Sequence, residues 1–209
     1  MSQRVEHYKQ VLEDVDTESL TVLVVAGATV ADVRSVIAAD AGLADGEVVE
    51  DHERSGYVFV DVDGGVLAME YTGYADPTVD ALARLSAGGR SAAVVGSDIQ
   101  AHDRFGCARD GVVLFDDPEY TYLDADDLSR VPDELRPLFD LVWVDLESDD
   151  EDDDSDVIAF AVGLAMAEQV TGIALTADDL GRLWEMGPSE MLPVRTLAYA
   201  TELDARRTE

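Results

Sequence analysis

The sequence predicts an α+β fold in which an antiparallel or mixed sheet, built from hairpins, is covered by helices on one face. Residues 56–72 alternate apolar and polar side chains around a glycine turn, and residues 104–116 are split by an Asp-Gly turn. Apolar residues at helical spacing recur between the strand pairs. A doubly wound parallel sheet is the alternative, because residues 22–37 could form a strand, a turn and a helix.

Composition limits the classes of function. The chain has 209 residues, which fits one domain, and 47% of them are hydrophobic, enough for a core. Its 46 acidic and 14 basic residues give a net charge of -32. A surface this negative repels phosphates and anionic lipids, so we expect no binding to nucleic acid or membranes. It suits a basic protein partner, although the same charge could serve only solubility or a salty cytoplasm.

Cysteine content and apolar segments indicate the compartment. Cys107 is the only cysteine, so the chain has no intrachain disulfide and no cysteine-based metal site. The first 16 residues lack the apolar core of a signal peptide. The longest apolar run, 157–167, is shorter than the roughly 20 residues that span a bilayer. We therefore expect a cytoplasmic protein without cofactors.

We expect a single domain over residues 21–186, preceded by a polar N-terminal arm or helix at 1–20 and followed by a C-terminal tail at 187–209. An acidic loop is expected at 145–156, since nine of these twelve residues are acidic and repel one another. The wider stretch 110–156 carries 19 acids and two arginines, which is more than half of the net charge.

Capping residues mark the expected helix starts. A buried strand at 21–25 leads into a helix that Thr29 caps, with Asp32 in the capping-box position. A second helix is expected to start with Asp76 as its cap and Pro77 at the first helical position.

The C-terminal half contains the second hairpin and two further helices. In that hairpin, the turn places Gly106 opposite Phe115. Residues 157–169 are apolar on nearly all sides, which predicts a buried helix. Thr176 opens the last helix with a capping box, and Trp184 is expected to face inward.

Glu70 is the most informative candidate for a ligand-binding or catalytic side chain. The hairpin register places it on the same face as Tyr57 and Phe59. A carboxylate half-buried against aromatic rings would have a raised pKa and could act as a general acid or base. The interpretation that the sequence favours is a solvated carboxylate on the open face of the sheet.

No other group of residues forms a recognisable active site or metal site. His102 lies near Cys107, which suggests a nucleophile pair, but Cys107 falls mid-strand opposite Leu114 and is expected to be an inert core residue. The three histidines lack the spacing of metal ligands, and no Ser-His-Asp set or paired-carboxylate motif stands out. These features favour a protein without enzymatic activity.

Several short stretches, rich in turn residues, occur in a defined order: 21–27, 56–57 with 69–70 and 73–74, 85–88, 105 with 110–111 and 115–116, and 171–176. In this order they resemble domain-of-unknown-function family 6461, an uncharacterised family of high-GC Gram-positive bacteria, over about residues 20–185. The resemblance implies no activity, cofactor or partner. Among the acids and glycines that match, Gly73, Asp110 and Gly111 have structural explanations, which leaves Glu70 as the candidate for function.

Two hypotheses of function follow. The first is a non-enzymatic interaction module, of immunity, antitoxin or accessory type, that binds a basic protein. Its candidate contact residues lie in the acidic loop: Asp149, Asp150, Glu151, Asp152, Asp153 and Asp154. The second is a small-ligand binder or hydrolase-like enzyme that uses a pocket around Glu70, Tyr57 and Phe59.

Overall fold

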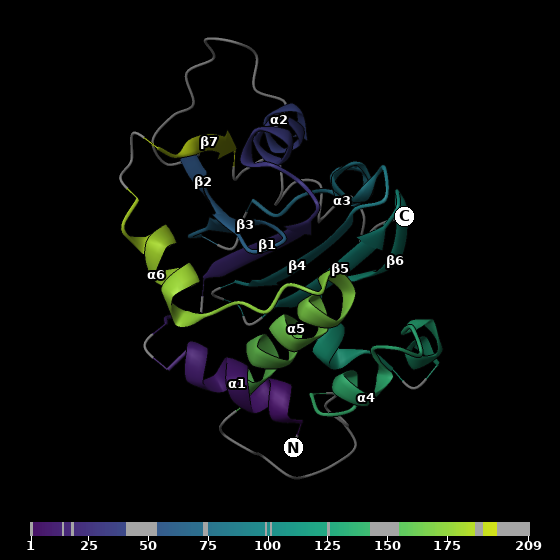
Figure 1. The fold of residues 1–209 in the computed structure, drawn as a ribbon. Coiled ribbons are helices and arrows are strands. Elements are labelled where there is room, and N and C mark those ends of the chain that lie inside the picture. The colour runs from purple at the N-terminus through teal and green to yellow at the C-terminus, as the bar shows by residue number, and fades with distance from the viewer. Residues whose placement is uncertain are drawn as a thin grey trace.

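The computed structural model describes residues 2–142 and 155–195, apart from gaps at 14, 18, 41–53, 73–74, 99, 101, 125 and 187–189 (Figure 1). The helices within these residues are α1 (Gln3–Val11), α2 (Val30–Asp40), α3 (Val79–Ser86), the 3-10 helices η2 (Tyr120–Tyr122) and η3 (Asp127–Arg130), α4 (Arg136–Phe139), α5 (Ser155–Thr171) and α6 (Ala177–Trp184). The strands are β1 (Leu20–Ala26), β2 (Arg54–Val62), β3 (Gly65–Glu70), β4 (Ser91–Ser97), β5 (Asp103–Arg109), β6 (Val112–Asp117) and β7 (Leu192–Arg195).

The strands form one sheet in the order β6-β5-β4-β1-β3-β2-β7, and every neighbouring pair is antiparallel. The prediction of an α+β fold with an antiparallel sheet is confirmed, and the parallel alternative is wrong. The central strand β1 is an apolar run that is buried along nearly its whole length. A strand of this kind needs cover on both of its faces.

Helices do cover both faces of the sheet, whereas the sequence predicts helices on one face only (Figure 1). On one face, α1, α4, α5 and α6 enclose a core that contains Val22 and Phe160. On the opposite face, α2 and α3 enclose a smaller core with Leu23, Phe59 and Leu82. The prediction fails because Val22 and Leu23 are successive residues of β1, so both faces of the strand are apolar.

The first hairpin has the predicted register. Its turn contains Gly64 with a φ angle of 88°, which a residue with a side chain rarely adopts. Val58 pairs with Met69, and Tyr57 lies directly opposite Glu70. The alternation of side chains along β2 was therefore sufficient to place Glu70 on its face of the sheet.

The second hairpin has the predicted turn, Asp110-Gly111, but a different register. Phe115 pairs with Cys107, whereas the sequence predicts Gly106 as its partner. The register shifts because a bulge inserts Leu114 as an extra residue of β6. The predicted pairing of Cys107 with Leu114 is wrong for the same reason.

The capping boxes predicted for α2 and α6 are both confirmed by reciprocal hydrogen bonds. The start of α3 differs from the prediction. Its cap is Thr78, whose hydroxyl accepts a backbone N–H, and not Asp76. The carboxylate of Asp76 instead accepts a hydrogen bond from the buried hydroxyl of Thr21.

The chain segments before and after the predicted domain contribute to the folded unit. Helix α1 packs against α5, where the buried Tyr8 donates a hydrogen bond of 2.9 Å to Glu168. Strand β7 pairs with β2. Helix α5 is buried as predicted, but Trp184 of α6, which was expected to face inward, is 45% exposed. Among the described helices, none is long and apolar enough to cross a membrane.

Candidate functional site

Glu70 is completely buried, which corrects the expectation of a solvated carboxylate. It lies on the face that α2 and α3 cover, so the open face that the sequence suggests does not exist. Its neighbours across the sheet are Tyr57 on β2 and Thr21 on β1. The row continues through Gly96 on β4 to Arg104 on β5. Polar side chains thus form a buried row across one end of the sheet.

Hydroxyl and amide donors hold the carboxylate of Glu70. Its Oε1 accepts a hydrogen bond from the Ser55 hydroxyl, from the Thr72 amide at 2.8 Å and from the Thr72 hydroxyl at 2.5 Å. Donors of this kind supply the hydrogen bonds that a buried carboxylate needs in place of water. They also tie the end of β3 to the start of β2.

Tyr57 and Phe59 lie on the same face as Glu70, as predicted, and both are also buried. The Tyr57 hydroxyl donates to the carbonyl of Ala75 at 2.6 Å. The guanidinium of Arg34 lies 5.7 Å from the centre of the Phe59 ring. The structure therefore brings the three predicted residues together on one face, but within the core. A groove of about 810 Å³ lies elsewhere, and its lining residues are Ala39, Asp40, Thr78, Val79, Asp80, Ala83 and Arg84.

An ion-pair network that the sequence did not predict lies at the end of this row. Arg104 is buried, with its side chain 6% exposed. Its Nη1 lies 3.3 Å from Asp76 Oδ2 and donates to the carbonyl of Pro77 at 2.8 Å, while Nε and Nη2 both donate to Asp116. One guanidinium therefore joins β5 and β6 to the segment before α3. The available signal was an arginine beside Phe105 near the start of the strand, but the segment before α3 that it contacts is distant in sequence.

Cys107 and His102 do not form a nucleophile pair. Burial raises the pKa of the Cys107 thiol to about 12, so it carries almost no thiolate at neutral pH. His102 instead contacts two carboxylates, Asp98 at 2.9 Å and Glu119 at 3.4 Å. Within the described residues, no group of three or more His, Cys, Asp or Glu side chains could hold a metal ion.

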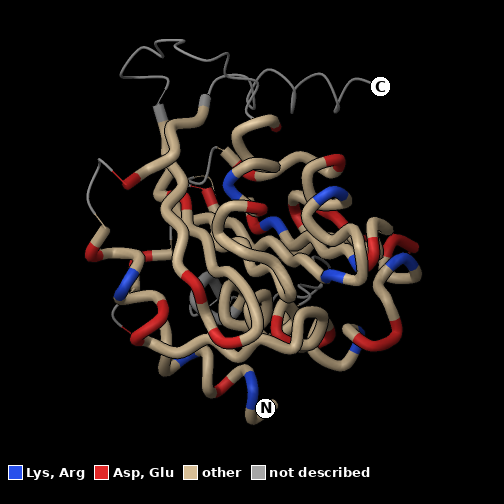
Figure 2. The backbone as a smooth tube through the Cα atoms, turned by 45° about the horizontal axis from the view of Figure 1, so that its top comes forward, with Lys and Arg blue, Asp and Glu red and all other residues tan. Residues whose placement is uncertain are grey.

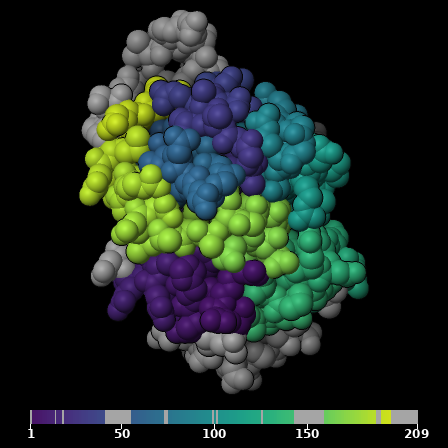
Figure 3. Space-filling model, viewed as in Figure 1, coloured from purple at the N-terminus to yellow at the C-terminus, as the bar shows by residue number. Residues whose placement is uncertain are grey.

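Residues 118–142, here called the acidic cap, contain seven acids and two arginines. The acidic cap comprises η2, η3 and α4, and its inner residues belong to the larger core. Its outer surface is the green region at the lower right of Figure 3. Its inner side is anchored by Tyr120, Leu135 and Phe139, which are all at most 1% exposed. The Tyr120 hydroxyl also donates to the carbonyl of Ala159 at 2.6 Å. These contacts anchor the acidic segment to the folded core.

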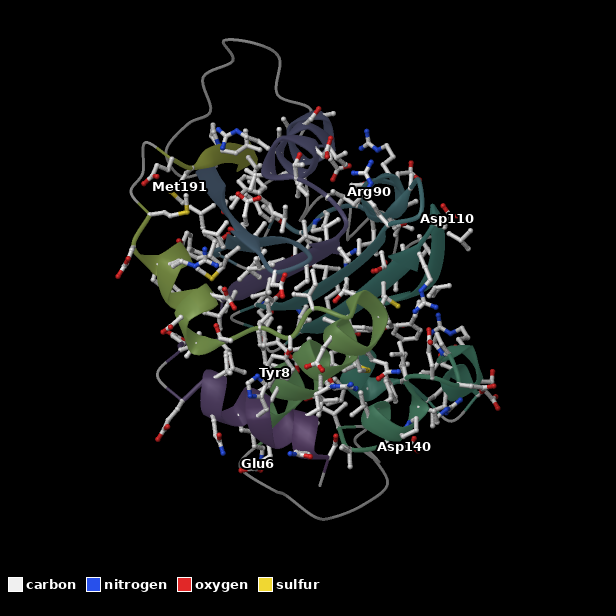
Figure 4. All side chains as sticks on the ribbon, viewed as in Figure 1. Glu6, Tyr8, Arg90, Asp110, Asp140 and Met191 are labelled. Atoms are coloured by element: carbon white, nitrogen blue, oxygen red, sulfur yellow. The ribbon has the colours of Figure 1, made fainter. Side chains whose placement is uncertain are left out.

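The outer side of the acidic cap is strongly negative. Four of its carboxylates are exposed and form no ion pair with any described residue: Asp124, Asp126, Asp133 and Asp140. Asp140 lies on the outer side of the acidic cap (Figure 4). Two large apolar side chains, Tyr122 and Leu141, are 46% and 41% exposed in the same segment. Acids also outnumber basic residues over the rest of the described chain (Figure 2).

The acidic loop that the sequence singles out, with Asp149 to Asp154, lies outside the described residues. Among the acids that the structure does place, those of the acidic cap come shortly before that loop in the sequence.

Comparisons with known proteins agree with the resemblance noted in the sequence. A family of unknown function, DUF6461, has a model that matches residues 9–182. No curated protein and no solved structure matches the chain. Since the match covers most of the sequence, from α1 to α6, the chain belongs to the DUF6461 family.

Proposed function

We propose that this protein is a non-enzymatic interaction module, of immunity, antitoxin or accessory type, that binds a basic protein partner. The acidic cap is the proposed contact surface, and Asp149 to Asp154, which follow it in the sequence, are proposed to add attraction. The supporting observation is that four exposed carboxylates of the acidic cap lack ion-pair partners among the described residues. Carboxylates without an internal counter-ion are available to the charges of a partner.

The composition of the acidic cap suits a protein partner better than a dispersed set of cations. Tyr122 and Leu141 offer apolar area beside the acids, and aromatic side chains are enriched where proteins meet. The segment is also anchored by buried side chains, so a partner would meet an ordered surface. Preorganisation of this kind lowers the entropic cost of association.

The test compares the wild-type chain with two variants that carry four substitutions each. Wild type is used to capture a partner from the native host, and the purified partner is then bound to two variants. One variant neutralises the acidic cap (Asp124→Asn, Asp126→Asn, Asp133→Asn and Asp140→Asn). The matched control removes four exposed charges elsewhere (Glu6→Gln, Asp63→Asn, Asp80→Asn and Glu185→Gln). Both variants lose the same net charge, so any difference between them reports the location of the charge.

We expect the association rate constant of the acidic-cap variant to fall about tenfold, with a much smaller change for the control. Binding should also weaken between about 0.15 M and 1 M salt, where the Debye length falls from about 8 Å to about 3 Å. Equal rate constants for the two variants would contradict the acidic cap as the contact surface. Failure to capture any basic partner at low salt would contradict the interaction function itself.

A second proposal, a small-ligand binder or hydrolase-like enzyme at Glu70, Tyr57 and Phe59, is favoured by the buried row of polar side chains. A buried carboxylate beside hydroxyl groups is a common starting point for acid-base chemistry. Each of the three side chains is at most 4% exposed, however, so a ligand would reach them only if the covering segments moved. Loss of activity in a stably folded Glu70→Gln variant would favour this proposal over the interaction module.

A further inference from the structure

Strand β6 forms one edge of the sheet (Figure 1). Within the described residues, its backbone forms hydrogen bonds with β5 only. Residues along an antiparallel strand alternate in the side to which their backbone groups point, so about half of the N–H and C=O groups of an edge strand face outward. Such an edge can accept another extended chain.

Of the side chains that usually protect an edge strand, β6 has only its two acids. It contains no lysine and no proline, and Val112 is 62% exposed. Its two acids are already engaged, Asp116 by Arg104 at 2.8 Å and Asp117 by Arg130 at 3.0 Å. Natural edge strands usually carry lysine, proline or an inward charge to prevent pairing.

The edge continues directly into the acidic cap. Two ion pairs join the hairpin to the acidic cap, Arg109 with Glu134 at 3.1 Å and Arg130 with Asp117. The rings of Phe115 on β6 and Phe139 on α4 are 6.2 Å apart. Asp110, at the turn that precedes β6, lies at the same margin of the sheet (Figure 4). A chain that paired with β6 would therefore lie beside unpaired carboxylates.

We propose that β6 pairs with an extended, lysine- or arginine-rich segment of the partner, which adds a strand to the sheet. This inference rests on the proposed function, because it states how the basic partner is held. Main-chain hydrogen bonds to β6 supply affinity, and the carboxylates of the acidic cap select basic side chains.

A second copy of this chain is less suited to pair with the β6 edge than a basic segment is. Each copy carries a net charge of -32, so two acidic caps brought together would repel. The bulge at Leu114 also increases the local twist of β6, which disfavours pairing between two identical edges. An extended and flexible basic segment can follow the twist and has the opposite charge.

The experiment uses a ten-residue peptide of alternating lysine and valine as the probe, with the full chain as the receptor. The control peptide has the same sequence but is N-methylated at every residue, so it keeps all charges and has no backbone donors. Dissociation constants are measured for both peptides, and amide hydrogen exchange is followed at residues 112–117. The acidic-cap variant described above is measured in parallel.

We expect the methylated peptide to bind at least about tenfold more weakly, since several main-chain hydrogen bonds are lost. The unmethylated peptide should also slow amide exchange within β6. Equal affinity for the two peptides, unchanged exchange at β6, or no binding of either peptide would overturn the strand-pairing inference. If both peptides bind equally but lose affinity for the acidic-cap variant, strand pairing fails while the proposed function stands.

Discussion

Two regions of this protein place their carboxylates in opposite environments. At the end of the sheet, Asp76 and Asp116 share the buried guanidinium of Arg104. In the acidic cap, Asp133 and Asp140 are exposed and have no ion-pair partner among the described residues. The sequence does not distinguish these aspartates, and only the structure separates them.

The difference shows how burial determines what a carboxylate can do. Two opposite charges about 4 Å apart attract by about 1 kcal/mol in water but by about 4 kcal/mol where the effective dielectric constant is near 20. Buried acids are therefore committed to their internal partner, and removing that partner is costly. Exposed acids contribute little to folding and remain available for intermolecular attraction.

The largest effect is expected for Arg104→Met. The substitution leaves the buried Asp76 and the partly buried Asp116 without their counter-ion, and breaking a buried ion pair in this way typically costs about 3–5 kcal/mol. Equilibrium unfolding in urea measures this loss. The matched control is Arg109→Met on the same strand, whose ion pair with Glu134 is about half exposed and should be worth at most about 1 kcal/mol.

Similar losses of unfolding free energy for the two arginine variants would mean that burial does not make the ion pairs of Arg104 more important than that of Arg109. A loss below about 1 kcal/mol for Arg104→Met would show that water or another cation compensates Asp76 and Asp116.

The next largest effect is expected for Glu70→Ala. The substitution removes the acceptor of the Ser55 hydroxyl and of two Thr72 donors, and unsatisfied buried donors cost about 1–3 kcal/mol. The conservative Glu70→Gln keeps one acceptor oxygen and should recover part of the stability. Urea unfolding compares both with Glu6→Gln on the exposed side of α1, which should change stability by less than about 0.5 kcal/mol. No loss in Glu70→Ala would mean that the site opens to solvent.

Local patterns in the sequence were enough to predict the hairpins and two helix starts. The alternation along β2 placed Glu70 beside Tyr57 because side-chain direction in a strand depends only on residue parity. The capping box at Thr29 and Asp32 was predictable because its two hydrogen bonds span three residues. Interactions of this range need no knowledge of the tertiary fold.

Features that depend on distant segments could not be predicted in the same way. The partner of Thr21 is Asp76, 55 residues away, so the sequence offered only a local role for Asp76 as a helix cap. The bulge at Leu114 shifts the register between β5 and β6, and composition alone cannot predict a bulge. Glu70 lies on a face of the sheet that the sequence predicts to be open but that α2 and α3 cover.

A third kind of carboxylate is exposed but hydrogen-bonded, and its contribution to stability can be measured by changing the pH. Hydrogen bonds from the hydroxyl and amide of Thr29 hold the pKa of Asp32 below its ordinary value of 3.8. Since the folded-state pKa is the lower one, this contribution to stability is present above pH 3.8 and is lost as pH falls through the folded-state pKa. Stability measured from pH 6 down to pH 2 should therefore fall more steeply in wild type than in Asp32→Asn. Parallel curves would show that the negative charge of Asp32 contributes nothing to stability.

The smallest effect on stability is expected for the acidic-cap variant with Asp124, Asp126, Asp133 and Asp140 changed to Asn. Exposed substitutions of this kind usually change stability by less than about 0.5 kcal/mol each, and here the removal of like-charge repulsion opposes any loss. Urea unfolding at low salt should give a stability equal to wild type or slightly higher, and at about 1 M salt the difference should vanish because the charges are screened. The four asparagines retain a side-chain oxygen, so the bonds that Asp124 accepts from the amides of the following turn can persist. A clear loss of stability that persists in high salt would mean that these acids support the fold, and a slower association of this variant could then no longer be assigned to the acidic cap as a contact surface.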